Sequence, residues 1–569
     1  MNKTGLGFSL HKEEIVAGRG VITSNHPLAS AAGIEMYSQG GNAFDAAIAS
    51  LFALTVVVPA SVSIFGAGYF VVRASNTGKI ETIDNYAVAP LKATEDMYEI
   101  VKERQPGQDI FETVGRKNIV GPLAVATPGT LKAWEYVNER YGELDFQTVI
   151  APAIRLARNG YRPSPLMTFS IEHNKPSIAA SPATAKTFLP GGKPVDLSTK
   201  IVMPEYADTL MKISENGSDS LYCGEVGQDV VKFMEENHGL ITMEDLAGYR
   251  LVMREPVKGV YREDYEIYSM APSSSGGTHI IQMLNMLESF DIGSTGFGSV
   301  EHLHLIAETL KIAYADRQRF MGDPALVKMP LGGLISKRYA EERAKEIGGR
   351  SRIYGPGDPF NYLGEGDETT HVSSMDADGN VVAATQTLNG GYGSGVTVPS
   401  LGILLNNCMA LFDPRPNRAN SVAGGKRMLS SMSPTIILRR GEPYLCIGTP
   451  GGLQIFPSIA QAIVNLIDFK MGIQEAVEAP RIWTMGIKGT PGERLLVESV
   501  IPQEVMASLA ARGHDVLPVT NVAGGMNGVL RDPDTGMLHG GACWRSDGAP
   551  MGISGGFASP KMLVPNPPY

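Results

Sequence analysis

The chain has little cysteine and no block of basic residues, and both shortages exclude classes of protein. Its 569 residues contain four cysteines, none in a C-x-x-C pair or at the spacing of a zinc site: Cys223, Cys408, Cys446 and Cys543. We therefore expect buried thiols in a reducing compartment and no metal. The formal net charge is −10 without a basic cluster, so nucleic acid is not an expected partner.

Long apolar runs are also absent. The longest, residues 46–59, is shorter than the roughly 18–20 residues that span a bilayer and ends in proline, so it predicts a buried helix. Residues 1–18 have no apolar core and no small-residue cleavage site of the secretory type. We therefore expect a cytoplasmic protein with no membrane partner.

What is present is the composition of a soluble enzyme rich in turns. Apolar residues make up 43%, charged residues 19%, and there are 65 glycines, which suits many tight turns. Apolar spacing predicts helices at 28–39, from 42 or 45 to 54, and at 131–141, 146–159, 277–290, 299–320 and 456–469. Strands are expected at 20–23, 64–72, 79–84 and 261–270, and residues 170–200 have the composition of a loop.

The most informative stretch is a predicted β-hairpin. Two strand-like runs, 369–375 and 381–388, flank a turn-rich segment centred on Asp378. A hairpin centred there places Thr369 opposite Thr387, at a Cβ separation of roughly 4.5–5.5 Å. A slip of one residue would move Thr387 to the other face.

A threonine in this setting can be a nucleophile or simply a strand residue. Its hydroxyl attacks poorly until a base removes the proton, and a free α-amine on the same residue, with a pKa of about 7.7–8.0, can be that base. This route requires a cut directly before Thr369. Strand propensity alone also explains the threonines.

The residues around the hairpin resemble the γ-glutamyltransferase (γ-glutamyltranspeptidase) family. Residues 368–371, 378–380 and 385–389 match its core. Further matches follow in the same order along most of the chain: Ser24–Ser30, Gly40–Ala47, Pro122–Thr130, Gly239–Leu246, Pro272–Gly277, Ala313–Arg317, Leu429–Thr435 and Pro450–Gly452. The resemblance implies an α+β fold of the N-terminal nucleophile hydrolase superfamily, a four-layer αββα sandwich.

The resemblance also implies self-cleavage and a set of catalytic residues. The precursor would divide into a large (α) subunit, 1–368, and a small (β) subunit, 369–569, which form one structural unit as a heterodimer; further oligomerisation stays open. Thr369 would be the nucleophile, its new α-amine the base and then the acid, and Thr387 its hydrogen-bond partner. Gly451 and Gly452 would form the oxyanion hole. No cofactor is implied.

The substrate-binding positions match the family only in part. By resemblance, Asn389 contacts the substrate α-amino group, and Ser430 and Ser431 hold its α-carboxylate. Tyr86, however, stands where the family has an arginine for that carboxylate, and a phenol cannot supply a bidentate guanidinium. Leu411 replaces the aspartate that pairs with the α-ammonium.

We therefore expect a self-cleaving amide hydrolase that acts through an acyl-enzyme on a small carboxylate-bearing amide. The acyl group would be γ-glutamyl-like or oxamate-like, as in a divergent branch similar to oxamate amidohydrolase. One alternative is a true γ-glutamyltransferase or glutathione hydrolase with relocated substrate recognition. A second alternative is an inactive homologue that only binds.

Three other patterns carry less weight. Residues 552–556 fit G-x-S-x-G but lack a strand–turn–helix context. His302 and His304, with Glu308, resemble a metal site, but positions i and i+2 of a helix point apart. His371 lies close to Thr369 in sequence and could be taken for a catalytic base. Adjacent residues of a strand face opposite ways, however, so its side chain should point away from the site.

Overall fold

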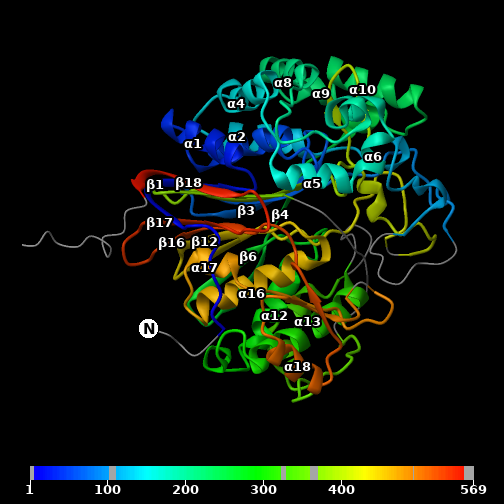
Figure 1. Ribbon diagram of the computed structural model, residues 1–569. Coiled ribbons are helices and arrows are strands. Elements are labelled where there is room, and N and C mark those ends of the chain that lie inside the picture. Colours follow the sequence, from blue (N-terminus) through cyan, green and yellow to red (C-terminus); the bar gives the residue numbers. More distant parts are fainter. Residues whose placement is uncertain are drawn as a thin grey trace, which may run out of the picture.

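The structure is a computed structural model that describes residues 6–101, 111–321, 329–358, 370–418, 420–490 and 492–556. Its centre is a 13-stranded β-sheet that doubles back on itself to form two stacked layers (Figure 1). The first layer runs in the order β4 (Val252–Arg254), β3 (Ile80–Asp84), β2 (Ala67–Arg73), β8 (Val381–Thr387), β7 (Thr370–Asp376) and β1 (Ile15–Ser24). The second continues with β17 (Leu538–Ala542), β16 (Asn527–Arg531), β12 (Glu442–Gly448), β11 (Thr435–Arg439), β6 (Tyr265–Ser269) and β5 (Val257–Tyr261).

Strand β1 joins the two layers. Its first residues, Ile15 to Ala17, pair with β17, and Gly20 to Thr23 pair with β7. Strand β18 (Ala549–Gly556) pairs along β1, with a register shift between Ala17 and Gly20. Because a bulge bends a strand and increases its twist, this irregularity lets one strand serve both layers.

Helices cover both outer faces, which completes the expected four-layer αββα arrangement (Figure 1). One face carries α1 (Pro27–Ser38), α2 (Ala43–Val57), α3 (Thr130–Tyr141), α4 (Phe146–Asn159), α8 (Pro204–Asn216), α9 (Asp219–Tyr222) and α10 (Glu225–Glu236). The other carries α12 (Gly276–Leu287), α13 (Val300–Phe320), α16 (Ile455–Ile467), α17 (Ile473–Glu478) and α18 (Gln503–Ala511). Among the described residues, no helix has the length and apolarity that a bilayer crossing requires.

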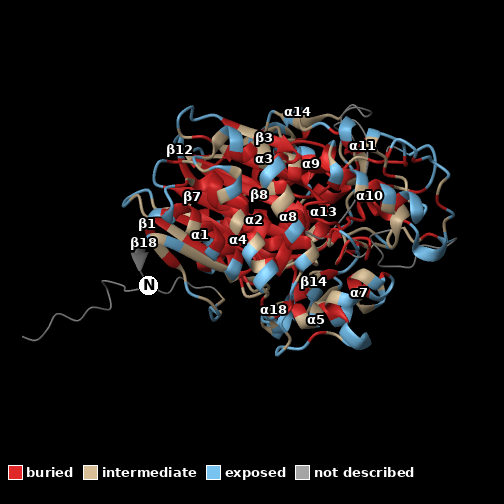
Figure 2. Ribbon diagram, turned by 90° about the horizontal axis from the view of Figure 1, so that it is seen from above, coloured by how far each residue is buried: buried red, intermediate tan, exposed pale blue. Residues whose placement is uncertain are grey.

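Burial follows these layers. Every residue of α2 is buried, as its apolar run predicts, and its start is fixed by reciprocal bonds between Asn42 and Asp45. Figure 2 shows the buried residues concentrated around α2, β7 and β8. Between the two sheet layers lies a separate cluster that includes Val71, Met375 and Ile436. The central hairpin is therefore enclosed on both faces.

The hairpin register is confirmed over its described residues. Thr370 pairs with Gln386, His371 with Thr385, and Met375 with Val381, which is the pairing expected of a turn centred on Asp378. Thr369 lies outside the described residues, so its pairing with Thr387 stays a prediction.

The expected loop at 170–200 is wrong as far as residue 188, whereas residues 193–200 lie outside helices and strands. This region contains α5 (Pro165–His173), α6 (Lys175–Ala179) and α7 (Pro182–Phe188). Ser164 and Ser181 accept hydrogen bonds as N-caps, and each helix has proline at its first positions. Serine and proline are favoured at helix starts as well as in loops, so their clustering here marks three short helices.

Two strand predictions also need correction. The expected strand at 261–270 forms only as β6, at Tyr265–Ser269, because Tyr261 ends β5 and the chain turns through Arg262 and Glu263 at positive φ. The expected strand at 64–72 begins only at Ala67. The remaining elements are β9 (Thr397–Val398), β10 (Ile403–Leu404), β13 (Ile482–Trp483), β14 (Leu495–Glu498), β15 (Val516–Val519), α11 (Met243–Gly248), α14 (Leu331–Leu334) and α15 (Lys337–Ala344).

Candidate active site

The turn that follows β8 positions two of the predicted site residues. Thr387 ends the strand, and its Oγ1 accepts a hydrogen bond of 2.8 Å from the backbone N–H of Asn389. Asn389 has a φ of 81° and its Nδ2 donates to the carbonyl of Asn407 at 3.1 Å. Its Oδ1 is buried and accepts no hydrogen bond from the described residues. This oxygen is therefore an available acceptor beside Thr387.

The start of β7 lies at the same end of the sheet. The Oγ1 of Thr370 is buried without a partner among the described residues. The ring of His371 lies between the hydroxyls of Thr385 and Ser373, at 2.8 and 2.9 Å. Burial lowers the pKa of His371 to about 3, so the ring is neutral and held by hydroxyls on its own strand pair. The predicted nucleophile, Thr369, directly precedes this segment but lies outside the described residues.

Gly451 and Gly452 have the backbone geometry that only glycine adopts easily. Their φ angles are 138° and 57°, and a Cβ on Gly451 would lie 2.8 Å from the Cβ of Ala523. They follow β12, whose last residue, Gly448, lies against the ring of His371. Neither glycine N–H has a hydrogen-bond acceptor in the described part of the chain. Two unused backbone donors are the requirement of an oxyanion hole.

The two glycines line a pocket of about 600 Å³. Asn25 also lines it, and the Oδ1 of Asn25 accepts a hydrogen bond from Asn527. The same Nδ2 of Asn527 donates to the carbonyl of His371 at 2.9 Å. The pocket therefore adjoins the first described residues of β7.

Ser430 and Ser431 are both 1% exposed and lie beside a backbone bridge to Ser274. The Oγ of Ser430 accepts a hydrogen bond from the N–H of Met432 at 3.2 Å. The Oγ of Ser431 accepts one from Nη2 of Arg317 at 2.8 Å. A hydroxyl has one proton to donate and can accept at its lone pairs. Each hydroxyl oxygen already accepts a hydrogen bond, and neither hydroxyl proton is donated to a described residue. Both protons can therefore be donated to an anion.

Arg317 is a site residue that the sequence analysis did not single out. It is fully buried in α13, and its Nε donates to Ser275 Oγ at 2.9 Å. The neighbouring Asp316 accepts a hydrogen bond from the N–H of Gly357 at 2.8 Å. The motif Ala313–Arg317 was noted as a family match, but its sequence neighbourhood gives no sign of contact with Ser431, which lies 114 positions away.

Tyr86 and Leu411 bring no charge to the site. Tyr86 is buried and stacks on Tyr69, with ring centroids 5.0 Å apart. The hydroxyl of Tyr69 is 2.8 Å from that of Ser273, whose carbonyl accepts from the N–H of Ser430. Leu411 is 4% exposed and belongs to the same hydrophobic cluster as Tyr86.

Asp413 does not take the place of the missing aspartate. Its two carboxylate oxygens bind the guanidinium of Arg415, with 2.9 Å between Arg415 Nε and Oδ1. Asp413 is the first acidic residue after Leu411, and it is thus already in an ion pair.

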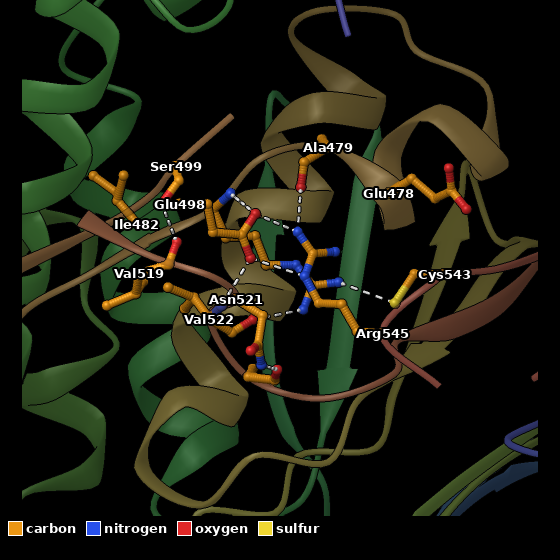
Figure 3. Close-up of polar contacts among 12 residues, drawn as sticks. Glu478, Ala479, Ile482, Glu498, Ser499, Val519, Asn521, Val522, Cys543 and Arg545 are labelled. Carbon is orange, nitrogen blue, oxygen red and sulfur yellow. Dashed lines mark hydrogen bonds and ion pairs between the residues drawn. The ribbon is translucent and has the colours of Figure 1, made fainter. Parts of the chain in front are cut away.

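A buried ion network fixes the far wall of the pocket (Figure 3). Glu498 accepts from Nε of Arg545 at 2.8 Å, from the N–H of Val522 at 2.7 Å and from the N–H of Arg481 at 3.0 Å. The guanidinium of Arg481 donates to the carbonyls of Val522 and Gly524. Burial and the nearby Arg545 lower the pKa of Arg481 to about 10, which leaves it charged at neutral pH. The network holds together the loops 521–525 and 543–547.

The histidine cluster on α13 does not suit a metal ion. His302 is separate, as expected, but the fold brings His514 to His304 and Glu308, with potential ligand atoms within 4.8 Å of one another. Nζ of Lys311 lies 2.5 Å from Oε1 of Glu308. The ammonium group of Lys311 therefore already supplies the positive charge beside Glu308 that a metal ion would bring.

The αββα fold, with two unused glycine donors in the turn after β12, is that of the N-terminal nucleophile hydrolases. The family model for gamma-glutamyltranspeptidase matches residues 29–553, and the chain belongs to this family. It is accordingly an enzyme, an amide hydrolase or acyltransferase of that class.

Relatives in the family include an acylase and a glutathione hydrolase. The chain is 47% identical to "Acylase ACY 1 proenzyme" of Pseudomonas sp. (strain SE83), over 97% of this chain and 96% of the relative. It is 36% identical to "Glutathione hydrolase proenzyme" of Escherichia coli (strain K12), over 93% and 91%. Among solved structures, cephalosporin acylase from Bacillus halodurans superposes with a TM-score of 0.85 at 29% identity, covering 98% of this chain and 99% of that one. The proenzyme names fit a self-processing amide hydrolase.

Proposed function

We propose that the chain cuts itself before Thr369 and that the mature enzyme is an acylase. The Thr369 hydroxyl attacks the amide carbonyl while its α-amine takes the proton and passes it to the leaving amine. The N–H groups of Gly451 and Gly452 stabilise the oxyanion; one such donor is worth roughly 2.7–4 kcal/mol in other enzymes. Thr387 holds the nucleophile, and water or an amine releases the acyl group.

The preferred acyl group carries a carboxylate but no α-ammonium. The hydroxyls of Ser430 and Ser431 donate to the carboxylate, and Arg317 holds the second of them in place. Leu411 offers no counter-charge to an ammonium group, which is expensive to bury without one. A γ-glutamyl group without its amino group is glutaryl, and the oxalyl group of oxamate is a shorter acyl group with a carboxylate.

The observation that carries this proposal is the buried, apolar environment of Leu411. The names of the acylase relatives support it. One relative in the solved structures is a cephalosporin acylase.

A matched set of p-nitroanilides tests the proposal. Glutaryl, γ-glutamyl and pentanoyl p-nitroanilides differ only in the presence of the α-amino group and the carboxylate. We expect kcat/KM to be highest for glutaryl, about tenfold or more lower for γ-glutamyl, and lowest for pentanoyl. Equal or better turnover of the γ-glutamyl substrate contradicts the proposal. Release of ammonia from oxamate measures the activity on the shortest acyl group.

A second candidate function is γ-glutamyl hydrolysis or transfer with relocated recognition. The free Oδ1 of Asn389 favours it, because a buried acceptor can take an ammonium hydrogen. The same anilide series decides between the two. A chain that stays uncut and forms no acyl-enzyme would instead be a homologue that only binds.

A further inference from the structure

The pocket beside the oxyanion glycines has walls from four distant parts of the chain. They are the segment 57–61 after α2, the helix α5, the loop 521–525 and the turn 545–547. Its volume of about 600 Å³ is that of a small-molecule site. The carbonyl of Ser61 accepts from the N–H of Leu388, and that of Ala60 from Tyr392. The pocket thus extends from Gly451 to the turn that carries Asn389.

The acyl-binding residues lie elsewhere. Ser430, Ser431, Tyr86 and Leu411 are not among the residues that line this pocket. An amide consists of an acyl half and an amine half that meet at the carbonyl, and the oxyanion donors must lie at that carbonyl. With the acyl half held outside the pocket, the pocket is left for the amine half.

Among the residues that the structure describes, the charged ones that line the pocket are Arg545 and Asp547. The side chain of Arg545 is only 1% exposed and is bound to Glu498. Asp547 is partly exposed. Its Oδ2 accepts a hydrogen bond from Ser164, the N-cap of α5, whereas its Oδ1 accepts none from the described residues. The charge available to a ligand is therefore the negative charge of Asp547.

Lys12 is a further cation, near enough to Asp547 to weaken its field. Nζ of Lys12 donates to the carbonyls of Cys543, Ser546 and Gly548, on the turn that carries Asp547. Its ammonium is thereby committed to the turn. It offsets part of the carboxylate's charge, so the expected selectivity is moderate.

We propose that this pocket binds the amine half of the substrate and that Asp547 makes it selective for amines that carry a positive charge. The proposal rests on the amidase activity proposed above for the reaction itself, but binding to the pocket does not require turnover. Leaving amines and acceptor amines with a cationic substituent bind more tightly because of the charge of Asp547. Amines with a carboxylate are repelled by it.

Three glutaryl anilides provide the test, identical except for an aminomethyl, a methyl or a carboxylate group at the meta position of the ring. In the wild-type enzyme we expect kcat/KM to fall in that order, with about tenfold between the first and the last. Asp547→Asn keeps the shape and removes the charge, so the ratio should fall to within about twofold of unity. Asp534→Asn, on the exposed turn after β16, is the matched control and should leave the ratio unchanged.

Calorimetric titration with the three free anilines separates this proposal from the proposed function. We expect the aminomethyl aniline to bind more tightly than the carboxylate form, and Asp547→Asn to abolish the difference while the thermal melting temperature is retained. If no amide is turned over but this binding pattern is found, the pocket proposal stands and the acylase proposal fails. Turnover or binding that does not distinguish the three substituents, or a ratio that Asp547→Asn leaves intact, overturns the pocket proposal alone.

Discussion

The side chain of Leu411 offers the smallest change that should redirect the acyl preference of this enzyme. Leu411→Asp would return a carboxylate to the position where the family pairs with an α-ammonium. We expect the ratio of kcat/KM for γ-glutamyl over glutaryl p-nitroanilide to rise by about tenfold or more. Because the site is buried, the substitution should also destabilise the free enzyme by about 1–3 kcal/mol.

Leu411→Asn controls for the shape and polarity of the new side chain. It has nearly the same size as aspartate and no charge, so it should lower stability without raising the ratio. If Leu411→Asn raises the ratio as much as Leu411→Asp, charge at this position does not determine the preference.

A second residue-level prediction concerns Arg317, which donates to Ser431 and which we propose acts on the substrate through it. Arg317→Lys keeps a positive charge but loses the planar fork that donates to both Ser431 and Ser275. We expect KM for glutaryl p-nitroanilide to rise about tenfold with little change in kcat, and the slow turnover of pentanoyl p-nitroanilide to be unaffected. Equal losses on both substrates would indicate a purely structural role.

At the scale of elements, the turn after β12 leaves no room for a side chain at Gly451. Gly451→Ala would place a Cβ against Ala523 at a φ of 138°, where a side chain is strained. We expect kcat to fall by roughly 10²–10³ as the oxyanion donor shifts, together with a lower melting temperature. Gly536→Ala is the control, since its φ of 73° is also positive but a Cβ there meets no atom within 4 Å. A comparable loss of kcat in both variants would contradict an oxyanion role.

The elements differ in how well local sequence determines them. The β7–β8 register follows from a turn whose residues are unambiguous, and α2 follows from an apolar run too short for a membrane. The helices α5 to α7 were missed because Ser164, Ser181 and the prolines beside them are equally typical of loops and of helix starts. Local pattern alone does not resolve that ambiguity; packing does.

The site was predictable where motifs are contiguous and not where the fold brings distant residues together. Gly451 and Gly452 could be proposed from a single motif, and the structure gives them unused donors. The contact of Arg317 with Ser431, and the hydrogen bond from Ser164 to Asp547 of the pocket wall, join residues 114 and 383 positions apart. Such contacts depend on the tertiary fold, which composition and periodicity do not specify.

For the whole molecule, buried histidines predict sensitivity to acid. Burial lowers the pKa of His279, His302 and His371 to about 3, whereas an unfolded histidine titrates near 6.5. Between these values the unfolded chain binds more protons, so stability is fully present above about pH 6.5 and is lost as the pH falls toward 3. Each such histidine should cost about 2 kcal/mol at pH 5.

Thermal melts at pH 7.5 and pH 5 measure this effect. We expect His302→Gln to melt lower than wild type at pH 7.5 but to lose less on acidification, because one titrating group is gone. His173→Gln, at an exposed histidine, should reproduce the wild-type pH dependence. An identical pH dependence in His302→Gln would show that His302 is not neutral in the folded protein.

Self-cleavage is the prediction that involves the molecule as a whole, because both proposed fragments contribute strands to one sheet. Strands β7 and β8 of the proposed small subunit lie between β2 and β1 of the large one, so the fragments should stay associated after the cut. We expect purified wild type to show two bands on a denaturing gel, for residues 1–368 and 369–569, and one species under native conditions. Thr369→Ala should remain a single inactive chain, while Thr369→Ser, which keeps a hydroxyl nucleophile, should still be cut. An active wild-type preparation whose intact mass is that of the uncut chain would exclude the α-amine as the catalytic base, since the nitrogen of Thr369 would still be an amide.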